Sequence, residues 1–299
     1  MTVHKPVLLH QTLELLGLKA GNVFLDGTFG GGGHGMEIVK AIAPNGRYIA
    51  IDKDKNAITN SGQEIKTFSE SLQVECRLIN GDFRNAKDIL ESLGIEKIDR
   101  ALLDLGFSSD QMDESGRGFS FLRNEPLLMT LSPDDEISAR DLINTASENK
   151  IEEILSSYGE EKFSKQIARA ICEDRKTNAI TTTWELVEVI KKATPSWYHH
   201  KKIHPATKVF QALRIWTNDE LGALEKFLAD FKHLAVKGTR LAVISFHSLE
   251  DRIVKRMFKG WEDEGLAVRV NKKAEMPVYG EIKSNRRSRS AKLRVCEFL

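Results

Sequence analysis

Cysteine is scarce in this chain: Cys76, Cys172 and Cys296 are the only three in 299 residues, and no CxxC pair occurs. Isolated thiols of this kind do not form a disulfide framework, which favours a reducing compartment. Long hydrophobic runs are also absent, because no apolar stretch approaches the roughly 20 residues that a membrane span needs. The segment from Met1 to Pro6 lacks the apolar region of a signal peptide. We therefore expect a cytoplasmic protein with no membrane partner.

Neither sign of charge dominates, since 44 Lys and Arg residues balance 43 Asp and Glu residues and leave a net charge of +1. Such a balance argues at first against a nucleic-acid partner. The distribution is uneven, however, because residues 252–299 hold 13 basic and 6 acidic residues. The densest basic segment is Lys283, Arg286, Arg287, Arg289, Lys292 and Arg294. This strip is typical of a surface that contacts phosphates, with a solvated charged loop as the alternative.

Short apolar runs alternate with helix-like periodicity through the first hundred residues, and further apolar runs follow near the end of the chain. The predicted strands are residues 23–26, 47–52, 74–79, 98–105, 239–246, 266–270 and 293–298. Strands that are apolar at nearly every position and alternate with helices predict an α/β fold. We expect a doubly wound parallel sheet with helices on both faces.

The alternation of strands and helices stops after Asp113. Between residues 138 and 197, apolar residues recur at spacings of three and four, which predicts helices and no strand. We therefore predict one α/β domain made of residues 1–112 and 207–299, interrupted by an all-helical insertion of residues 113–206.

Glycine is concentrated in one run, Gly30 to Gly33, just after the first predicted strand, which ends in Asp26. Open α/β sheets bind ligands beyond the carboxyl ends of their strands, and glycines let the backbone approach a ligand closely. No Lys-Ser/Thr pair follows the run, so a P-loop is excluded. Asp52 ends the second predicted strand about 20 residues later, where a carboxylate can accept ribose hydroxyls. This pattern suits NAD and S-adenosylmethionine equally, and an ordinary turn is the alternative.

Two further candidates follow the third and fourth predicted strands. Phe83 can stack on an adenine base, although a lone Phe is more often part of a core. Asp104 stands where the reacting end of an adenosine-type cofactor would lie. Hydride transfer usually needs a His or Lys proton donor there, and neither is present, whereas methyl transfer needs mainly alignment. If the methyl acceptor is an amino group on a base, a carboxylate can accept its N–H groups, and Asp104 is of the right type for this.

His247 and Ser248 end the fifth predicted strand and are followed by two acidic residues and an arginine at 250–252. A lone His is more often structural than catalytic, but this group of polar residues makes His247 and Ser248 candidates. A Ser–His hydrolase is not supported, because no G-x-S-x-G motif occurs. No metal site is expected, because the three histidines between 199 and 204 lie beside two lysines.

Motifs that include most of these positions occur in a fixed order along the chain. They are His4-Lys-Pro-Val-Leu-Leu, Thr28-Phe-Gly-x-Gly-Gly-His34, Asp104-Leu-Gly-x-Ser-Ser-x-Gln111, Arg117-Gly-Phe-Ser-Phe121, Tyr158-Gly-Glu-Glu161, His204-Pro-Ala-Thr207, Phe210-Gln-Ala-Leu-Arg-Ile215 and Ser245-Phe-His-Ser-Leu-Glu-Asp-Arg252. This set resembles the MraW/RsmH family of bacterial small-subunit ribosomal RNA methyltransferases over nearly the whole chain.

The resemblance implies a Rossmann-like class I methyltransferase sheet, with S-adenosylmethionine as the methyl donor. It implies that the acceptor is N4 of a cytidine in the decoding centre. The partner is small-subunit rRNA or the assembled small subunit, in the cytoplasm, and the helical insertion helps to grip RNA. The cofactor-binding residues that it implies are Gly32, Gly33, His34, Asp52, Phe83, Asp104 and Gln111. Since it gives no secure general base, Asp104, His247 and Ser248 are the candidates for the acceptor site.

The chain departs from the family pattern after Phe121. Leu128 and Thr130 stand where relatives often have an acid and an arginine, which puts substrate contacts of this segment in doubt. Two alternative functions stay open. One is an NAD-dependent oxidoreductase with the same sheet, and the other is a catalytically weak RNA-binding or assembly protein. The oligomeric state, with a homodimer among the alternatives, is open as well.

Overall fold

The computed structural model describes residues 6–107, 112, 116–132, 135 and 137–299. The chain forms two compact units, residues 1–107 with 221–299 and residues 108–220. Among the described residues, no helix is both long enough and apolar enough to cross a bilayer.

The first unit contains a seven-stranded sheet in the order β3-β2-β1-β4-β5-β7-β6. The strands are β1 (Val23–Asp26), β2 (Arg47–Asp52), β3 (Glu75–Asn80), β4 (Ile98–Asp104), β5 (Ala235–Ser245), β6 (Ala267–Arg269) and β7 (Lys292–Phe298). Strands β1 to β5 pair in parallel, whereas β7 lies between β5 and β6 and runs antiparallel to both. The predicted α/β fold is confirmed. The sheet is mixed and not entirely parallel as expected, because the apolar pattern of a strand does not indicate its direction.

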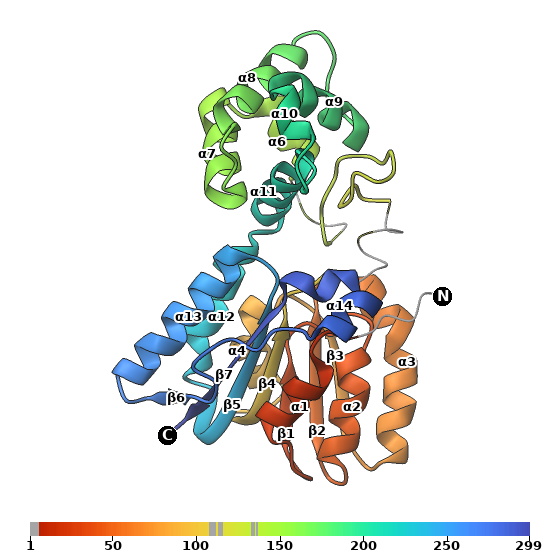
Figure 1. Ribbon diagram of the computed structural model, residues 1–299. Coiled ribbons are helices and arrows are strands. Elements are labelled where there is room, and N and C mark those ends of the chain that lie inside the picture. The colour runs from red at the N-terminus through yellow and green to blue at the C-terminus, as the bar shows by residue number, and fades with distance from the viewer. Residues whose placement is uncertain (1–5, 108–111, 113–115, 133–134, 136) are drawn as a thin grey trace. The chain divides into compact units, whose positions relative to one another are not determined.

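Helices cover both faces of this sheet (Figure 1). Those that pack on one face are α1 (Leu9–Leu16), α2 (Gly33–Ile42) and α3 (Lys55–Ser71), and those on the other are α4 (Ala86–Ser92), α12 (Glu220–Phe231) and α13 (Ser248–Asp263). Successive strand residues serve opposite cores: Phe24 packs with the first group of helices and Leu25 with the second. This burial on both faces explains the apolar runs of the central strands. Three short helices, η1 (Phe83–Asn85), α14 (Tyr279–Ser284) and η2 (Arg286–Ser290), complete the unit.

Helix α13 was not among the predicted helices. Its start is nevertheless encoded locally, because the side chain of His247 caps the helix and Glu250 returns a hydrogen bond to the N-cap backbone. A capping box normally has Ser or Thr in the first position, so a histidine conceals the signal.

Among the described residues of the second unit, the regular elements are helices, whereas residues 116–132 form no helix and contribute one isolated bridge between Pro126 and Thr182. Its helices are α6 (Ala139–Thr145), α7 (Glu148–Gly159), α8 (Ser164–Asp174), α9 (Thr183–Ala193), α10 (Ser196–His199) and α11 (Ala206–Asn218). The predicted boundaries at 112 and 206 differ from the observed ones at 107 and 220. The second boundary moves because α11 packs against α7 and therefore lies with the helical unit.

Candidate active site

Three strands of the first unit end in an aspartate at one edge of the sheet: β1 in Asp26, β2 in Asp52 and β4 in Asp104. The chain runs from β1 out to β2 and β3, then returns to β4 on the other side of β1. Such a reversal leaves a crevice at the carboxyl ends of the strands, where open α/β sheets bind ligands. Asp52 and Asp104 therefore lie at the edge of the sheet where a cofactor would bind.

At Gly27, the turn after β1 leaves no room for a side chain. A Cβ atom at Gly27 would overlap Leu103 Cδ2, and the Gly27 N–H donates to Leu102 O over 2.9 Å. Gly32 is the N-cap residue of α2 with φ +73°, a conformation that only glycine adopts at little cost. Because Gly32 has no side chain, it does not cap the first-turn N–H groups of α2. Gly32 and Gly33 thus bring backbone rather than side chains to the ligand-binding edge.

Asp52 is held by backbone amides on both of its oxygens. Oδ2 accepts the Gly30 N–H at 2.7 Å, and Oδ1 accepts the Asp54 N–H at 2.8 Å. Burial raises the pKa of Asp52 to about 6, against the lowering effect of these two hydrogen bonds. The carboxylate is therefore still largely ionised at neutral pH. Each oxygen keeps acceptor capacity for a ribose hydroxyl, so the geometry suits the predicted role.

Asp104 and His34 lie side by side. The Asp104 N–H donates to Thr28 Oγ1 at 2.6 Å, and Asp104 Oδ2 lies 3.4 Å from His34 Nδ1. The other ring nitrogen, Nε2, lies 3.1 Å from Val7 O, and since a carbonyl only accepts, Nε2 carries the proton. Burial lowers the pKa of His34 and favours its neutral form. Neutral His34 thus directs an unprotonated Nδ1 at Asp104, so two proton acceptors meet at the end of β4.

Asp26 is a buried support for the site, and sequence reasoning did not single out the residues that hold it. Its Oδ2 accepts the Tyr48 hydroxyl at 2.6 Å and its Oδ1 accepts the Thr28 N–H at 3.1 Å. Burial raises the pKa of Asp26. Thr28 therefore links the two aspartates: its backbone N–H binds Asp26, and its hydroxyl binds the backbone N–H of Asp104. Thr28 lies inside a motif that the resemblance used, whereas the sequence carries no signal for Tyr48.

Phe83 lies in η1 and is only partly buried. Its ring meets Phe227 edge-on, with ring centroids 5.8 Å apart, and its Cβ lies 3.3 Å from where a Gly27 Cβ would stand. Asp82 fixes this turn, because its side chain accepts the Arg84 N–H at 3.0 Å. Phe83 thus borders the glycine turn while one edge packs on the core.

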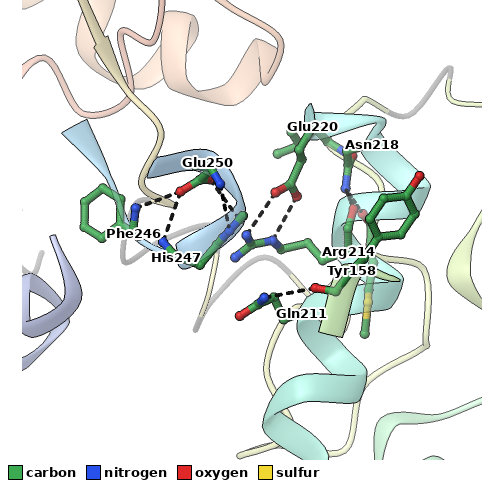
Figure 2. A network of polar contacts seen from close by, with 10 residues as sticks. Tyr158, Gln211, Arg214, Asn218, Glu220, Phe246, His247 and Glu250 are labelled. Atoms are coloured by element: carbon green, nitrogen blue, oxygen red, sulfur yellow. Dashed lines mark hydrogen bonds and ion pairs between the residues drawn. The ribbon is translucent and has the colours of Figure 1, made fainter. Parts of the chain in front are cut away.

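His247 and Ser248 stand at the start of α13, and Figure 2 shows the contacts of His247. Glu250 Oε2 accepts the backbone N–H of Phe246 at 2.7 Å and of His247 at 3.2 Å. His247 Nδ1 accepts the Glu250 N–H at 3.4 Å, and Nε2 lies 3.0 Å from Glu250 Oε1. These contacts give His247 a capping role that sequence reasoning did not foresee. The acceptor-site roles of His247 and Ser248 stay predictions.

The basic strip divides into two parts. Lys292 and Arg294 do not point to a ligand, because Asp251 accepts hydrogen bonds from both, at 2.9 and 2.7 Å. Burial opposes the charge of Asp251, yet these two cations hold its pKa below the ordinary value. The exposed part consists of Lys283, Arg286, Arg287 and Arg289, on α14 and η2. The predicted strip is therefore corrected to these four residues.

Gln111, the last predicted cofactor residue, lies outside the described residues. The segment that departs from the family pattern belongs to the helical unit. Asn218 holds it in place, since its Oδ1 accepts the Leu131 N–H at 3.0 Å and its Nδ2 donates to Met129 O at 2.8 Å. Thr130 is buried, so it offers little polar surface to a substrate.

The chain is similar over its whole length to known proteins. The chain matches the MraW methylase family over residues 1–299. It is 40% identical to ribosomal RNA small subunit methyltransferase H of Clostridioides difficile, with 98% of each chain covered. It is 43% identical to the protein of the same name from Legionella pneumophila, with 100% of each chain covered. A solved putative rRNA-methylase from Clostridium thermocellum is 12% identical, with a TM-score of 0.47 and coverage of 97% of this chain and 95% of that one. From the match over its whole length and these identities, the chain is a member of the MraW methylase family.

Proposed function

We propose that this chain transfers a methyl group from S-adenosylmethionine to N4 of a cytidine in the decoding centre of small-subunit ribosomal RNA. The observation that carries the proposal is the shared edge of the sheet, where the glycine turn, Asp52 and Asp104 meet. The similarity to proteins named ribosomal RNA small subunit methyltransferase H supports the choice of substrate. We place the reaction in the cytoplasm.

The residues at this edge fit S-adenosylmethionine. The aspartates at the ends of β1, β2 and β4 suit a cofactor that carries a positive charge. The bound cofactor supplies a methyl group that its sulfonium already activates. Asp52 would accept the ribose hydroxyls, Phe83 would line the adenine pocket, and backbone at Gly32 would lie against the cofactor.

At the methyl-acceptor site, Asp104 and His34 would both act as proton acceptors. A cytosine amino group is a poor nucleophile because its lone pair is delocalised into the ring. The Asp104 carboxylate would accept an N–H of this group and localise the lone pair on nitrogen. Methyl transfer leaves a surplus proton on N4, and Asp104 would accept it, with neutral His34 Nδ1 at 3.4 Å as a second acceptor.

An NAD-dependent oxidoreductase is one alternative, although residues 104–111 contain neither His nor Lys. The fold nevertheless brings His34, a residue distant in sequence, to Asp104. Membership of a methylase family favours methyl transfer instead. A catalytically weak RNA-binding or assembly protein is the second alternative, and mapping of methylcytidines distinguishes it from an active methyltransferase.

The experiment is mass-spectrometric mapping of methylcytidines in small-subunit rRNA from cells with and without this protein. One cytidine should lose its N4 methyl group in the deletion strain, and purified protein with S-adenosylmethionine should restore it. Unchanged methylation at every cytidine would reject the activity, and altered subunit assembly without a methylation change would favour the assembly protein.

Cofactor affinity should fall in acid, because protonated Asp52 loses acceptor capacity. Its pKa is raised to about 6, so the carboxylate form is complete above that pH and is lost as the pH falls through it. The Kd for S-adenosylmethionine should therefore be constant near pH 8 and rise about tenfold per pH unit below 6. Calorimetry between pH 5 and 8 measures this. Asp52→Asn, which cannot titrate, should bind more weakly with a flat profile, and a flat profile in the wild type would contradict the role.

Neutralising the exposed strip should weaken RNA binding in a salt-dependent way. If Arg286, Arg287 and Arg289 each contact a phosphate, their change to Gln should reduce the slope of log K against log salt by about 2. Filter binding of small-subunit rRNA across a salt series measures the slope. Lys255, Arg256 and Lys259, which are also exposed in the same unit, provide a matched triple change to Gln that should leave the slope unchanged. Equal slopes for both variants would mean that the strip is only solvated.

A further inference from the structure

The helical unit carries a group of aromatic rings and lysines around α10, which we call the Trp197 patch: Lys162, Phe163, Trp197, Tyr198 and Lys201. The indole of Trp197 is 53% exposed, which is unusual for so large an apolar side chain. Its ring centroid lies 5.9 Å from that of Tyr198 and 6.0 Å from that of Phe163. The patch thus presents an indole to solvent, and this indole packs on two neighbouring aromatic rings.

A buried carboxylate holds these packed rings in place. Glu161 Oε2 accepts the Tyr198 hydroxyl at 2.8 Å, and Oε1 accepts the Phe163 N–H at 2.9 Å. Burial and this carboxylate raise the pKa of Tyr198 well above its ordinary value, so the phenol keeps its proton. The rings beneath Trp197 are therefore held in one arrangement before any ligand arrives.

The charge around the indole is positive. Lys162 Nζ lies 4.2 Å and Lys201 Nζ lies 5.0 Å from the centroid of the Trp197 ring. Residues 191–208 contain five lysines and three histidines and no acidic residue. Cation–π contacts at an exposed site are weak, whereas stacking of a nucleobase on an aromatic ring is stronger. A base can therefore replace a lysine on the indole and leave the ammonium free for a neighbouring phosphate.

We propose that the Trp197 patch binds an unpaired segment of the RNA substrate, with one base stacked on Trp197 and the phosphates beside it on Lys162 and Lys201. Single-stranded RNA is recognised in this way, by aromatic stacking within a basic surface. An anionic membrane would need a row of exposed apolar side chains, and the patch offers a single indole. The inference rests on the proposed function, because an enzyme that methylates a base in a ribosomal RNA needs an unpaired segment held near it.

The test compares Trp197→Ala with Trp184→Ala, its matched control. Trp184 is 52% exposed on α9 in the same unit, and no lysine lies over its ring among the contacts that the structure describes. Two measurements apply: the Kd for a labelled single-stranded RNA of about 12 nucleotides, and kcat and KM for methylation of small subunits that lack the modification. We expect Trp197→Ala to raise the Kd and KM about tenfold with kcat unchanged, whereas Trp184→Ala matches the wild type.

Two further variants separate stacking from folding. Trp197→Phe keeps an aromatic face and should restore most of the affinity. The double change of Lys162 and Lys201 to Gln should reduce the salt slope by about 1.4, the value for two phosphates of a single strand. Equal RNA affinity in wild type, Trp197→Ala and Trp184→Ala, while the wild type methylates subunits, would overturn this inference and leave the function standing. Absence of methylation in the wild type would overturn the function itself, and binding to anionic vesicles but not to RNA would reassign the patch.

Discussion

Replacement of Asp104 by Ala should abolish methylation while the protein stays folded. The carboxylate ends β4, is 14% exposed, and is the proposed acceptor for the N–H groups of the cytosine. Removing one group that stabilises developing charge typically lowers kcat by about 10²–10³. Loss of a proton acceptor in the same change adds to this, so the rate should fall below detection in a standard assay. Transfer of a labelled methyl group to small subunits measures it.

Asp104→Asn is a second variant, in which the side chain keeps the shape of aspartate. The amide keeps the shape and one acceptor oxygen but cannot accept a proton as a carboxylate does, so it should be nearly as inactive as Asp104→Ala. The melting temperature should stay close to that of the wild type, because the Asp104 backbone N–H still reaches Thr28 Oγ1. Full activity in either variant would remove Asp104 from the mechanism, and lost cofactor binding without a kcat effect would assign it to the cofactor alone.

Replacement of Asp52 by Ala should weaken cofactor binding by about 10²-fold or more. Two hydrogen bonds from ribose hydroxyls to a carboxylate would be lost, each worth about 1.5–3 kcal/mol. The Gly30 N–H, which now donates to Asp52 Oδ2 at 2.7 Å, would lose its partner as well, so the glycine turn would also lose its tie to β2. Calorimetric titration with S-adenosylmethionine gives the Kd directly.

Asp54→Ala is the control for this change. Asp54 is two residues away, and its side chain caps α3 by accepting the Asn56 N–H at 3.1 Å. Its loss should cost about 1 kcal/mol of stability, and the Asp54 backbone N–H that Asp52 accepts is retained. Cofactor affinity should therefore stay within a few fold of the wild type. If both variants lost affinity equally, the effect would come from the local fold rather than from the ribose contact.

The sequence predicted the sheet well because each strand carries its own signal. The apolar runs within β1, β2, β4 and β5 reflect burial on both faces, whereas the edge strand β3 is more polar and more exposed. The direction of β7 carries no such signal. Helix α13 was missed because its capping residue, His247, is an unusual one.

Candidate site residues could be predicted from the sequence only where their place at the end of a single strand determines their position in the fold. Asp52 and Asp104 follow from their places at strand ends, which any parallel sheet brings to one edge. The pairing of His34 with Asp104 depends on contacts between segments 70 residues apart. No local pattern encodes it, which is why a histidine was judged to be missing there. For the same reason, a count of basic residues included Lys292 and Arg294, whose partner Asp251 lies in another element.

The position of the helical unit between β4 and β5 has a consequence for synthesis. Asp104 of β4 pairs in register with Ile244 of β5, so the two strands meet only after the whole helical unit has been made. Until then β4 is an open edge strand with a row of unpaired backbone groups, a form of structure prone to pair with other chains. The strand that carries Asp104 is thus the one that waits longest for its neighbour. Nascent chains that pause within residues 108–220 would be the ones most exposed to aggregation and most in need of a chaperone.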